Sequence, residues 1–172
     1  MEAMVLVTYA TRNGSTAELA QAVAEALGAN GLAAEVLPAK DTRSLERYGA
    51  VVLAAPLYMF RLHKDARRFL KRNRMALASI PVALFVPGPV NTDEKEWVGA
   101  REQLQKELAR FPWLAPVAQY VVGGKFDPKK LGFPFNLIPA MKRMPASDVR
   151  DWAAIRALAG ELAVTLRPTL RA

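Results

Sequence analysis

Cysteine is absent from this chain of 172 residues, and histidine occurs once, at His63. The absence of thiols excludes disulfides, thiolate nucleophiles, iron–sulfur clusters and zinc–thiolate sites, and a single histidine excludes a histidine-rich metal centre. No apolar run approaches the roughly 20 residues that span a bilayer. The N-terminus also lacks the basic and apolar regions of a signal peptide. We therefore expect a cytoplasmic protein without a bound metal.

Acidic residues are fewer than basic ones, 16 against 24, which gives a formal net charge of +8. Such an excess fits an acidic partner, and it fits equally well a solubility role or an arginine-rich compositional bias. The chain has no recognised nucleic-acid-binding motif and no basic strand interleaved with aromatic residues. We therefore expect no nucleic-acid partner. Composition leaves the oligomeric state open.

Apolar runs alternate with amphipathic helical patterns along the chain. Most of the runs are too apolar to have one face in water, which is typical of a parallel sheet covered by helices on both faces. The sequence thus predicts a single three-layer α/β domain over residues 1–172, with an irregular segment at about 125–150. The expected strands are 5–10, 33–37, 50–55, 81–86 and 117–122, and the expected helices are 15–27, 41–48, 64–74, 93–110 and 151–166.

The first apolar run leads directly into the loop Thr11-Arg12-Asn13-Gly14-Ser15-Thr16, and a helical pattern begins at about Ser15. Hydroxyl, amide and main-chain donors at the positive end of a helix suit a phosphate. The glycine–lysine loop of ATPases and the three-glycine dinucleotide loop are both excluded by sequence. What remains is a loop for a singly esterified phosphate. The alternative is a simple turn at Gly14 with Ser15 as a helix cap.

The stretch from Tyr9 to Thr16 resembles the flavodoxin signature, in which an aromatic residue precedes a Ser/Thr-rich loop and a threonine opens the helix. Thr11 matches the first hydroxyl position, and Gly14 matches the small residue within the loop. Thr8 departs from the pattern, which usually has an apolar residue there. The resemblance implies a flavodoxin-like fold, with five strands in the order 2-1-3-4-5. It also implies noncovalent flavin mononucleotide (FMN), with its phosphate on this loop.

Two further loops follow the third and fourth apolar runs, and the carboxyl ends of parallel strands bring such loops to one edge. By resemblance, both loops contact the flavin ring. Tyr58 or Phe60 is the candidate for stacking on the ring, and the alternative is that these rings only cover the sheet edge. The second loop has no aromatic residue. The loops comprise Pro56, Leu57, Tyr58, Met59 and Phe60, and Pro87, Gly88, Pro89 and Val90.

The residues Pro56-Leu57-Tyr58 and Ala66-Arg67-Arg68-Phe69 resemble a flavodoxin-domain group that includes the quinone-dependent protoporphyrinogen dehydrogenases. The resemblance implies an FMN-dependent oxidoreductase that uses a quinone or a redox partner protein. The alternative is a non-enzymatic electron carrier or binding protein. No side chain stands out as catalytic, because the reaction would belong to the flavin.

The segment from Lys125 to Arg150 is rich in apolar and basic residues. By resemblance it is an insertion, and it is a candidate contact for a quinone, a tetrapyrrole or the inner face of the membrane. The alternative is a covering segment that packs Phe135, Leu137 and Met141 onto the sheet. Pro139 is expected to kink any helix there. His63 precedes a basic helix and is interpreted as a cap or surface residue.

Overall fold

A computed structural model describes residues 3–171 of the protein. Its main sheet contains β1 (Met4–Tyr9), β2 (Ala34–Pro38), β3 (Tyr48–Ala54), β6 (Val82–Pro87) and β7 (Ala118–Val122). The order is β2-β1-β3-β6-β7, with every neighbouring pair parallel. Counted in chain order, these strands give 2-1-3-4-5, so the predicted fold class and strand order are confirmed.

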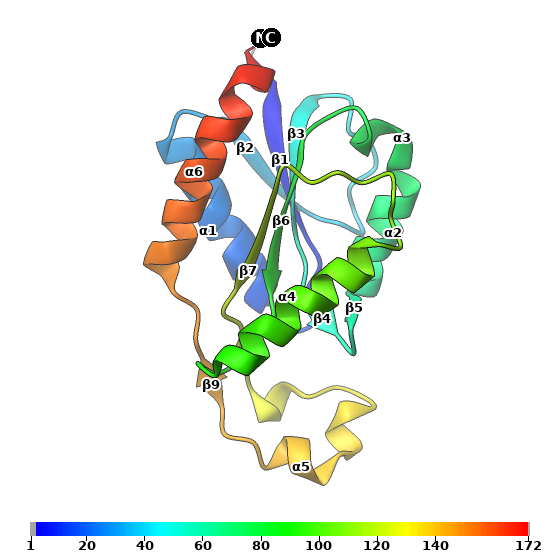
Figure 1. The fold of residues 1–172 in the computed structure, drawn as a ribbon, viewed down its shortest axis with the longest axis vertical. Helices are drawn as coiled ribbons and strands as arrows, with labels where there is room; N and C mark the ends of the chain where they lie inside the picture. The colour runs from blue at the N-terminus through cyan, green and yellow to red at the C-terminus, as the bar shows by residue number, and fades with distance from the viewer. Residues whose placement is uncertain (1–2, 172) are drawn as a thin grey trace.

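Helices cover both faces of the sheet (Figure 1). The helices α1 (Ser15–Ala29) and α6 (Trp152–Leu170) lie on one face, and α2 (Lys64–Arg72), α3 (Arg74–Leu77) and α4 (Glu94–Leu108) lie on the other. Within β1, Val5 and Val7 pack under α1 and α6, while Leu6 packs against the opposite layer, as strand alternation requires. None of the helices described here has the length and apolar composition needed to cross a membrane.

The prediction of a helix over 41–48 is wrong, because the chain forms turns there and then enters β3. The Thr42 hydroxyl donates to the Pro38 carbonyl oxygen at 3.0 Å, and the Ser44 hydroxyl accepts from the Glu46 N–H at 3.3 Å. Such local bonds compete with the helical pattern. The helix expected over 64–74 is also divided, since Asn73 caps the end of α2 and α3 begins at the next residue.

The 125–150 segment extends beyond the end of the sheet instead of lying on one of its faces (Figure 1). It contains β8 (Lys125–Phe126), η1 (Pro128–Lys130), η2 (Phe135–Leu137), α5 (Pro139–Lys142) and β9 (Ser147–Asp148), with β8 and β9 antiparallel. Leu137 is 65% exposed, so the expectation that this segment packs Phe135, Leu137 and Met141 onto the sheet is wrong. Pro139 begins α5 instead of kinking it.

The buried core on the α2 side provides a test of the packing. Replacing Leu53, which is 1% exposed, by alanine should lower the free energy of unfolding by about 2–5 kcal/mol, because lost burial and a cavity add. The control Val164→Ala lies on the outer face of α6 and should change it by less than about 0.5 kcal/mol. Urea denaturation measures both. Equal effects at the two positions would contradict the layer assignment.

Candidate functional site

A cavity of about 340 Å³ lies beyond the carboxyl ends of β1, β3 and β6. Eleven of the fifteen residues predicted from the sequence line it, so the structure brings the three predicted loops to one place. These eleven are Arg12, Asn13, Ser15, Thr16, Pro56, Leu57, Tyr58, Met59, Pro87, Gly88 and Val90. The other four, which do not line this cavity, are Thr11, Gly14, Phe60 and Pro89.

The 11–16 loop leaves the start of α1 open. Gly14 is the N-terminal flanking residue of the helix, with a φ of 91°, and no side chain caps the first turn. A Cβ at Gly14 would meet no atom within 4 Å, so the positive φ alone favours glycine there. The Thr11 hydroxyl accepts from the Gly14 N–H at 2.8 Å and fixes the turn. Ser15 is therefore the first helical residue and not the cap.

The first N–H groups of an α-helix have no acceptor within the helix, and they carry the positive end of its dipole. Ser15 and Thr16, which supply two of these groups, both line the cavity. An anion at this edge of the cavity would therefore accept from main-chain N–H groups and hydroxyls. The geometry suits a phosphate without requiring a lysine.

The side chains of Arg12 and Asn13 hold the 125–150 segment over the loop. The Arg12 guanidinium donates to the Phe133 carbonyl oxygen and lies 5.2 Å from the centre of the Phe135 ring. When the Asn13 amide is turned so that its nitrogen and not its oxygen faces the segment, it donates to the Lys130 carbonyl oxygen at 3.2 Å. The segment therefore forms a wall of the same cavity.

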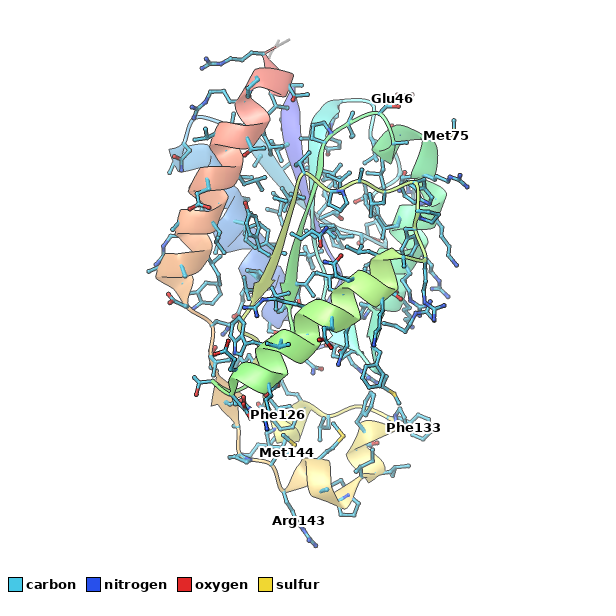
Figure 2. All side chains as sticks on the ribbon, in the orientation of Figure 1. Glu46, Met75, Phe126, Phe133, Arg143 and Met144 are labelled. Atoms are coloured by element: carbon cyan, nitrogen blue, oxygen red, sulfur yellow. The ribbon has the colours of Figure 1, made fainter. Side chains whose placement is uncertain are left out.

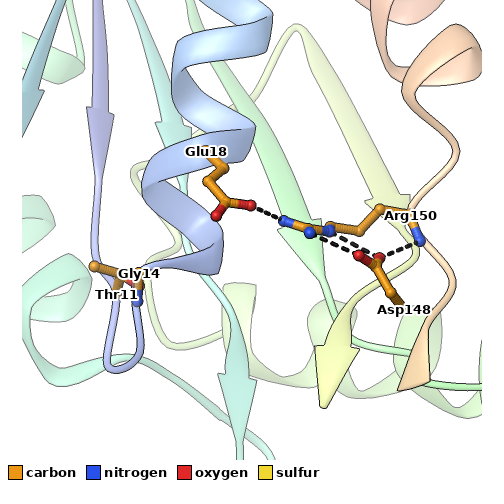
Figure 3. A network of polar contacts seen from close by, with 5 residues as sticks. All are labelled: Thr11, Gly14, Glu18, Asp148 and Arg150. Carbon is orange, nitrogen blue, oxygen red and sulfur yellow. Dashed lines mark hydrogen bonds and ion pairs between the residues drawn. The ribbon is translucent and has the colours of Figure 1, made fainter. Parts of the chain in front are cut away.

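A second attachment joins the returning end of the segment to α1 (Figure 3). The Arg150 side chain is 7% exposed, and it donates to both carboxylate oxygens of Asp148 and to Glu18 in the first turn of α1. The hydrogen bond from Arg150 holds the pKa of Asp148 below its usual value. Arg150 also lies 4.7 Å from the Trp152 ring centre. The segment is thus attached both to the 11–16 loop and to α1.

Aromatic rings reach the cavity from a place that sequence reasoning missed. Phe126 and Phe135 both line it, although the 87–90 loop has no aromatic residue. Figure 2 shows Phe126 and Phe133 on opposite sides of the segment. The Gly123-Gly124 pair was the available signal in the sequence, because paired glycines indicate a close approach of two backbone segments. A Cβ at Gly123 would lie 2.0 Å from the Val149 carbonyl oxygen. The residues that follow this crossing, Gly124, Lys125 and Phe126, line the cavity.

The loop after β3 forms a hairpin of β4 (Leu57–Tyr58) and β5 (Arg61–Leu62). Its two turn residues, Met59 and Phe60, have positive φ angles of 47° and 67°. Turns of this shape favour asparagine and glycine, because a left-handed residue with a side chain costs about 1–2 kcal/mol. Both side chains are exposed, at 72% and 67%. Phe60 therefore lies at the outer tip of the hairpin and not in the cavity.

Glu107 of α4 anchors this hairpin, a role that was not predicted from the sequence. Its carboxylate is fully buried, accepts from Arg61 Nε at 2.8 Å and from the Leu62 N–H at 3.2 Å, and lies 3.4 Å from Arg110 Nε. A glutamate on the polar helix predicted over 93–110 looked solvated. Its position three residues after the buried Leu104 was the only signal of burial.

Pro89 has a structural place in the second loop. It is buried, and its carbonyl oxygen accepts from the Gly124 N–H at 2.7 Å. The 87–90 loop is therefore tied to the start of the 125–150 segment, just as the 11–16 loop is tied to its middle.

His63 caps α2, as interpreted from the sequence. Its Nδ1 accepts from the Asp65 N–H at 3.1 Å, and its ring centre lies 6.0 Å from that of Tyr58. Burial lowers the pKa of His63, Asp65 opposes this, and the cations Lys64, Arg12 and Arg67 lower it further. Burial raises the pKa of Tyr58, and Arg12 partly opposes that shift. Arg12, Lys64 and Arg67 thus place positive charge near the side of the hairpin next to α2.

Comparison with known proteins agrees with this geometry. A family model described as a flavodoxin domain matches residues 6–142. The chain belongs to the flavodoxin-domain family. The resemblance noted from the sequence is thus confirmed at the level of the family.

Among curated proteins, this flavodoxin-domain chain is 25% identical to protoporphyrinogen IX dehydrogenase [quinone] of Escherichia coli strain K12. That alignment spans 178 positions, 96% of this chain and 98% of the relative. A flavodoxin from the domain Archaea superposes with a TM-score of 0.60 at 12% identity, over 95% of this chain and 99% of its own. Megasphaera elsdenii flavodoxin in its two-electron reduced form superposes with a TM-score of 0.58 at 17% identity, over 94% of this chain and 99% of its own. These two structures establish the fold.

The Glu107 anchor can be tested by substitution. Glu107→Ala should lower the free energy of unfolding by about 2–4 kcal/mol, because it removes a buried acceptor for Arg61 and Leu62. It should also speed hydrogen exchange of the Leu62 amide at least about tenfold. The control Glu102→Ala is exposed on the same helix and should change neither. Unchanged exchange at Leu62 in the Glu107 variant would refute the anchor.

The single histidine makes its titration easy to follow by NMR. We expect the His63 ring to titrate below the ordinary value of about 6.5, because burial disfavours its charged form. A histidine pKa that is lower in the folded than in the unfolded protein means that the folded state binds fewer protons. Stability is therefore lost as the pH falls below about 6.5. A midpoint at or above 6.5 would refute this description of the site.

Proposed function

We propose that this protein binds FMN noncovalently in the 340 Å³ cavity and acts as a redox protein. The observation that carries the proposal is the start of α1, which no side chain caps and which lies at the edge of that cavity. The hydroxyls of Ser15 and Thr16 and the first N–H groups of α1 would bind the phosphate. The hydroxyl of Thr11 would support them by fixing Gly14.

The ring would lie between the 57–62 hairpin and the 87–90 loop. Main-chain groups of Leu57 and Tyr58 would face its polar edge, since the Val90 N–H already donates to Glu96 at 3.1 Å. The rings of Tyr58, Phe126 and Phe135 line the cavity and would be available for stacking. The 125–150 segment would exclude water from one side. When bound, the flavin supplies the hydride and electron transfer, while the protein orients it and sets its electrostatic surroundings.

The proposed reaction is oxidation of a tetrapyrrole such as protoporphyrinogen, with a quinone as electron acceptor. The support is the curated relative, whose name states that activity and whose alignment includes the 125–150 segment. Phe133, Leu137 and Ile138 on this segment are exposed beside Lys129 and Lys142. Such a mixed apolar and basic surface suits a quinone or peripheral contact with an anionic membrane.

A non-enzymatic electron carrier is the second candidate. The observation that favours it is the exposed tip of the hairpin, where Met59 and Phe60 lie next to the proposed ring site. An apolar tip held in a strained turn suits contact with a redox partner protein as well as with a small substrate.

Glycine substitutions test the phosphate loop. Gly14→Ala should weaken FMN binding about tenfold, because an alanine disfavours the positive φ that opens the helix start. Gly28→Ala is the matched control, since a Cβ there also meets no atom within 4 Å and its φ is not positive. Quenching of FMN fluorescence measures both affinities. Equal affinities of the two variants would contradict the role of Gly14.

An assay of catalytic turnover distinguishes the dehydrogenase hypothesis from the electron-carrier hypothesis. The FMN-loaded protein is expected to oxidise protoporphyrinogen to the fluorescent porphyrin in the presence of a quinone, faster than free FMN does at the same concentration. The flavin-free protein serves as the control. If the loaded protein accepts electrons from an artificial reductant but leaves protoporphyrinogen unchanged, the carrier hypothesis holds and the dehydrogenase hypothesis fails.

A further inference from the structure

A second cavity, of about 430 Å³, lies on the α2 side of the 57–62 hairpin. Its walls come from the end of the 11–16 loop, the hairpin and the first turn of α2. We infer that this cavity binds the carboxylate groups of a flat, apolar acid whose ring system approaches the flavin. The identity of the acid as a tetrapyrrole rests on the proposed function, whereas the carboxylate site itself rests on the cavity.

The side chains that line the second cavity carry mostly positive charge. Arg12, Arg61, Lys64 and Arg67 line it, and Asp65 is the acidic residue among its lining. The nearest cation to the Asp65 carboxylate is Arg68 of the same helix, whose Nη1 lies 3.9 Å away. The cavity therefore holds an excess of positive charge that its own acidic residue does not neutralise.

Most of these cations have no acidic partner. Arg61 is paired with the buried Glu107. Among residues 3–171, no ion pair is formed by Arg12, Lys64 or Arg67. Arg67 Nε donates to the Leu62 carbonyl oxygen at 3.0 Å, which fixes the guanidinium beside the hairpin. A guanidinium held in this way, next to a lysine, matches the geometry and charge of carboxylate oxygens.

The two cavities adjoin. Arg12 and Tyr58 belong to the lining of both. A ligand can therefore place its acidic groups among the cations while its ring system lies against Tyr58 and the exposed Met59 and Phe60 of the hairpin tip. This combination of an apolar surface and a cationic pocket recognises a flat apolar acid. It binds a neutral ester of the same molecule much more weakly.

Mesoporphyrin IX and its dimethyl ester are suitable probes, because they share one ring system and differ in the charge of two groups. Both are titrated into the protein in the same detergent buffer, and binding is followed by fluorescence. We expect the diacid to bind the wild-type protein at least about tenfold more tightly than the ester, as paired charges at a partly open site imply. Equal affinity, or no binding of either probe, would overturn the inference.

Two double variants with the same loss of charge locate the effect. Lys64→Gln/Arg67→Gln removes cations that line the cavity and should weaken diacid binding about tenfold, with ester binding unchanged. Lys71→Gln/Lys106→Gln removes two exposed cations that lie outside the cavity, on α2 and α4, and should change neither. Lys64→Gln alone should show a smaller loss in the same direction. If both doubles weaken the diacid equally, net charge and not the cavity is responsible.

FMN binding is measured in parallel on each variant. Retained FMN affinity in Lys64→Gln/Arg67→Gln shows that the flavin site is intact when carboxylate binding is lost. Failure of the wild-type protein to bind FMN would overturn the proposed function, while the comparison of diacid and ester would still decide the carboxylate site.

Discussion

The first turn of α1 exposes main-chain N–H groups that no carbonyl of the helix can accept, and the rest of the site depends on this constraint. Gly14 in a left-handed conformation brings the chain from β1 into the helix without a side-chain cap, and Thr11 fixes that turn. Because β3 and β6 end at the same edge, their loops complete a cavity around the helix start. An anionic group would complement the N–H groups at this edge.

The remaining contacts hold that edge in shape. The buried Glu107 attaches the 57–62 hairpin to α4, and Arg150 attaches β9 to Glu18 of α1. Arg12 connects the 11–16 loop to the 125–150 segment. Each of these bonds joins residues far apart in sequence, so the walls of the cavity are positioned by long-range hydrogen bonds and ion pairs and not by local turns alone. A strained hairpin tip at Met59 and Phe60 persists because its two strands are fixed in this way.

The sequence was sufficient for the sheet, because fully buried parallel strands read as continuous apolar runs and the helices between them are amphipathic. It also located the three loops, since strand ends of a parallel sheet share one edge. It failed at 41–48, where Thr42 and Ser44 bond to the local backbone. It also missed Glu107, Phe126 and Phe135, whose roles depend on contacts across the fold that no local pattern encodes.

The central claim is that the start of α1 binds the phosphate of a flavin. The most direct measurement is calorimetric titration of the flavin-free protein with FMN and with riboflavin, which has the same ring and lacks the phosphate. Several charge-assisted bonds to main-chain N–H groups and hydroxyls predict that FMN binds at least about 100-fold more tightly. Equal affinities for the two flavins, or no binding of FMN, would contradict the account.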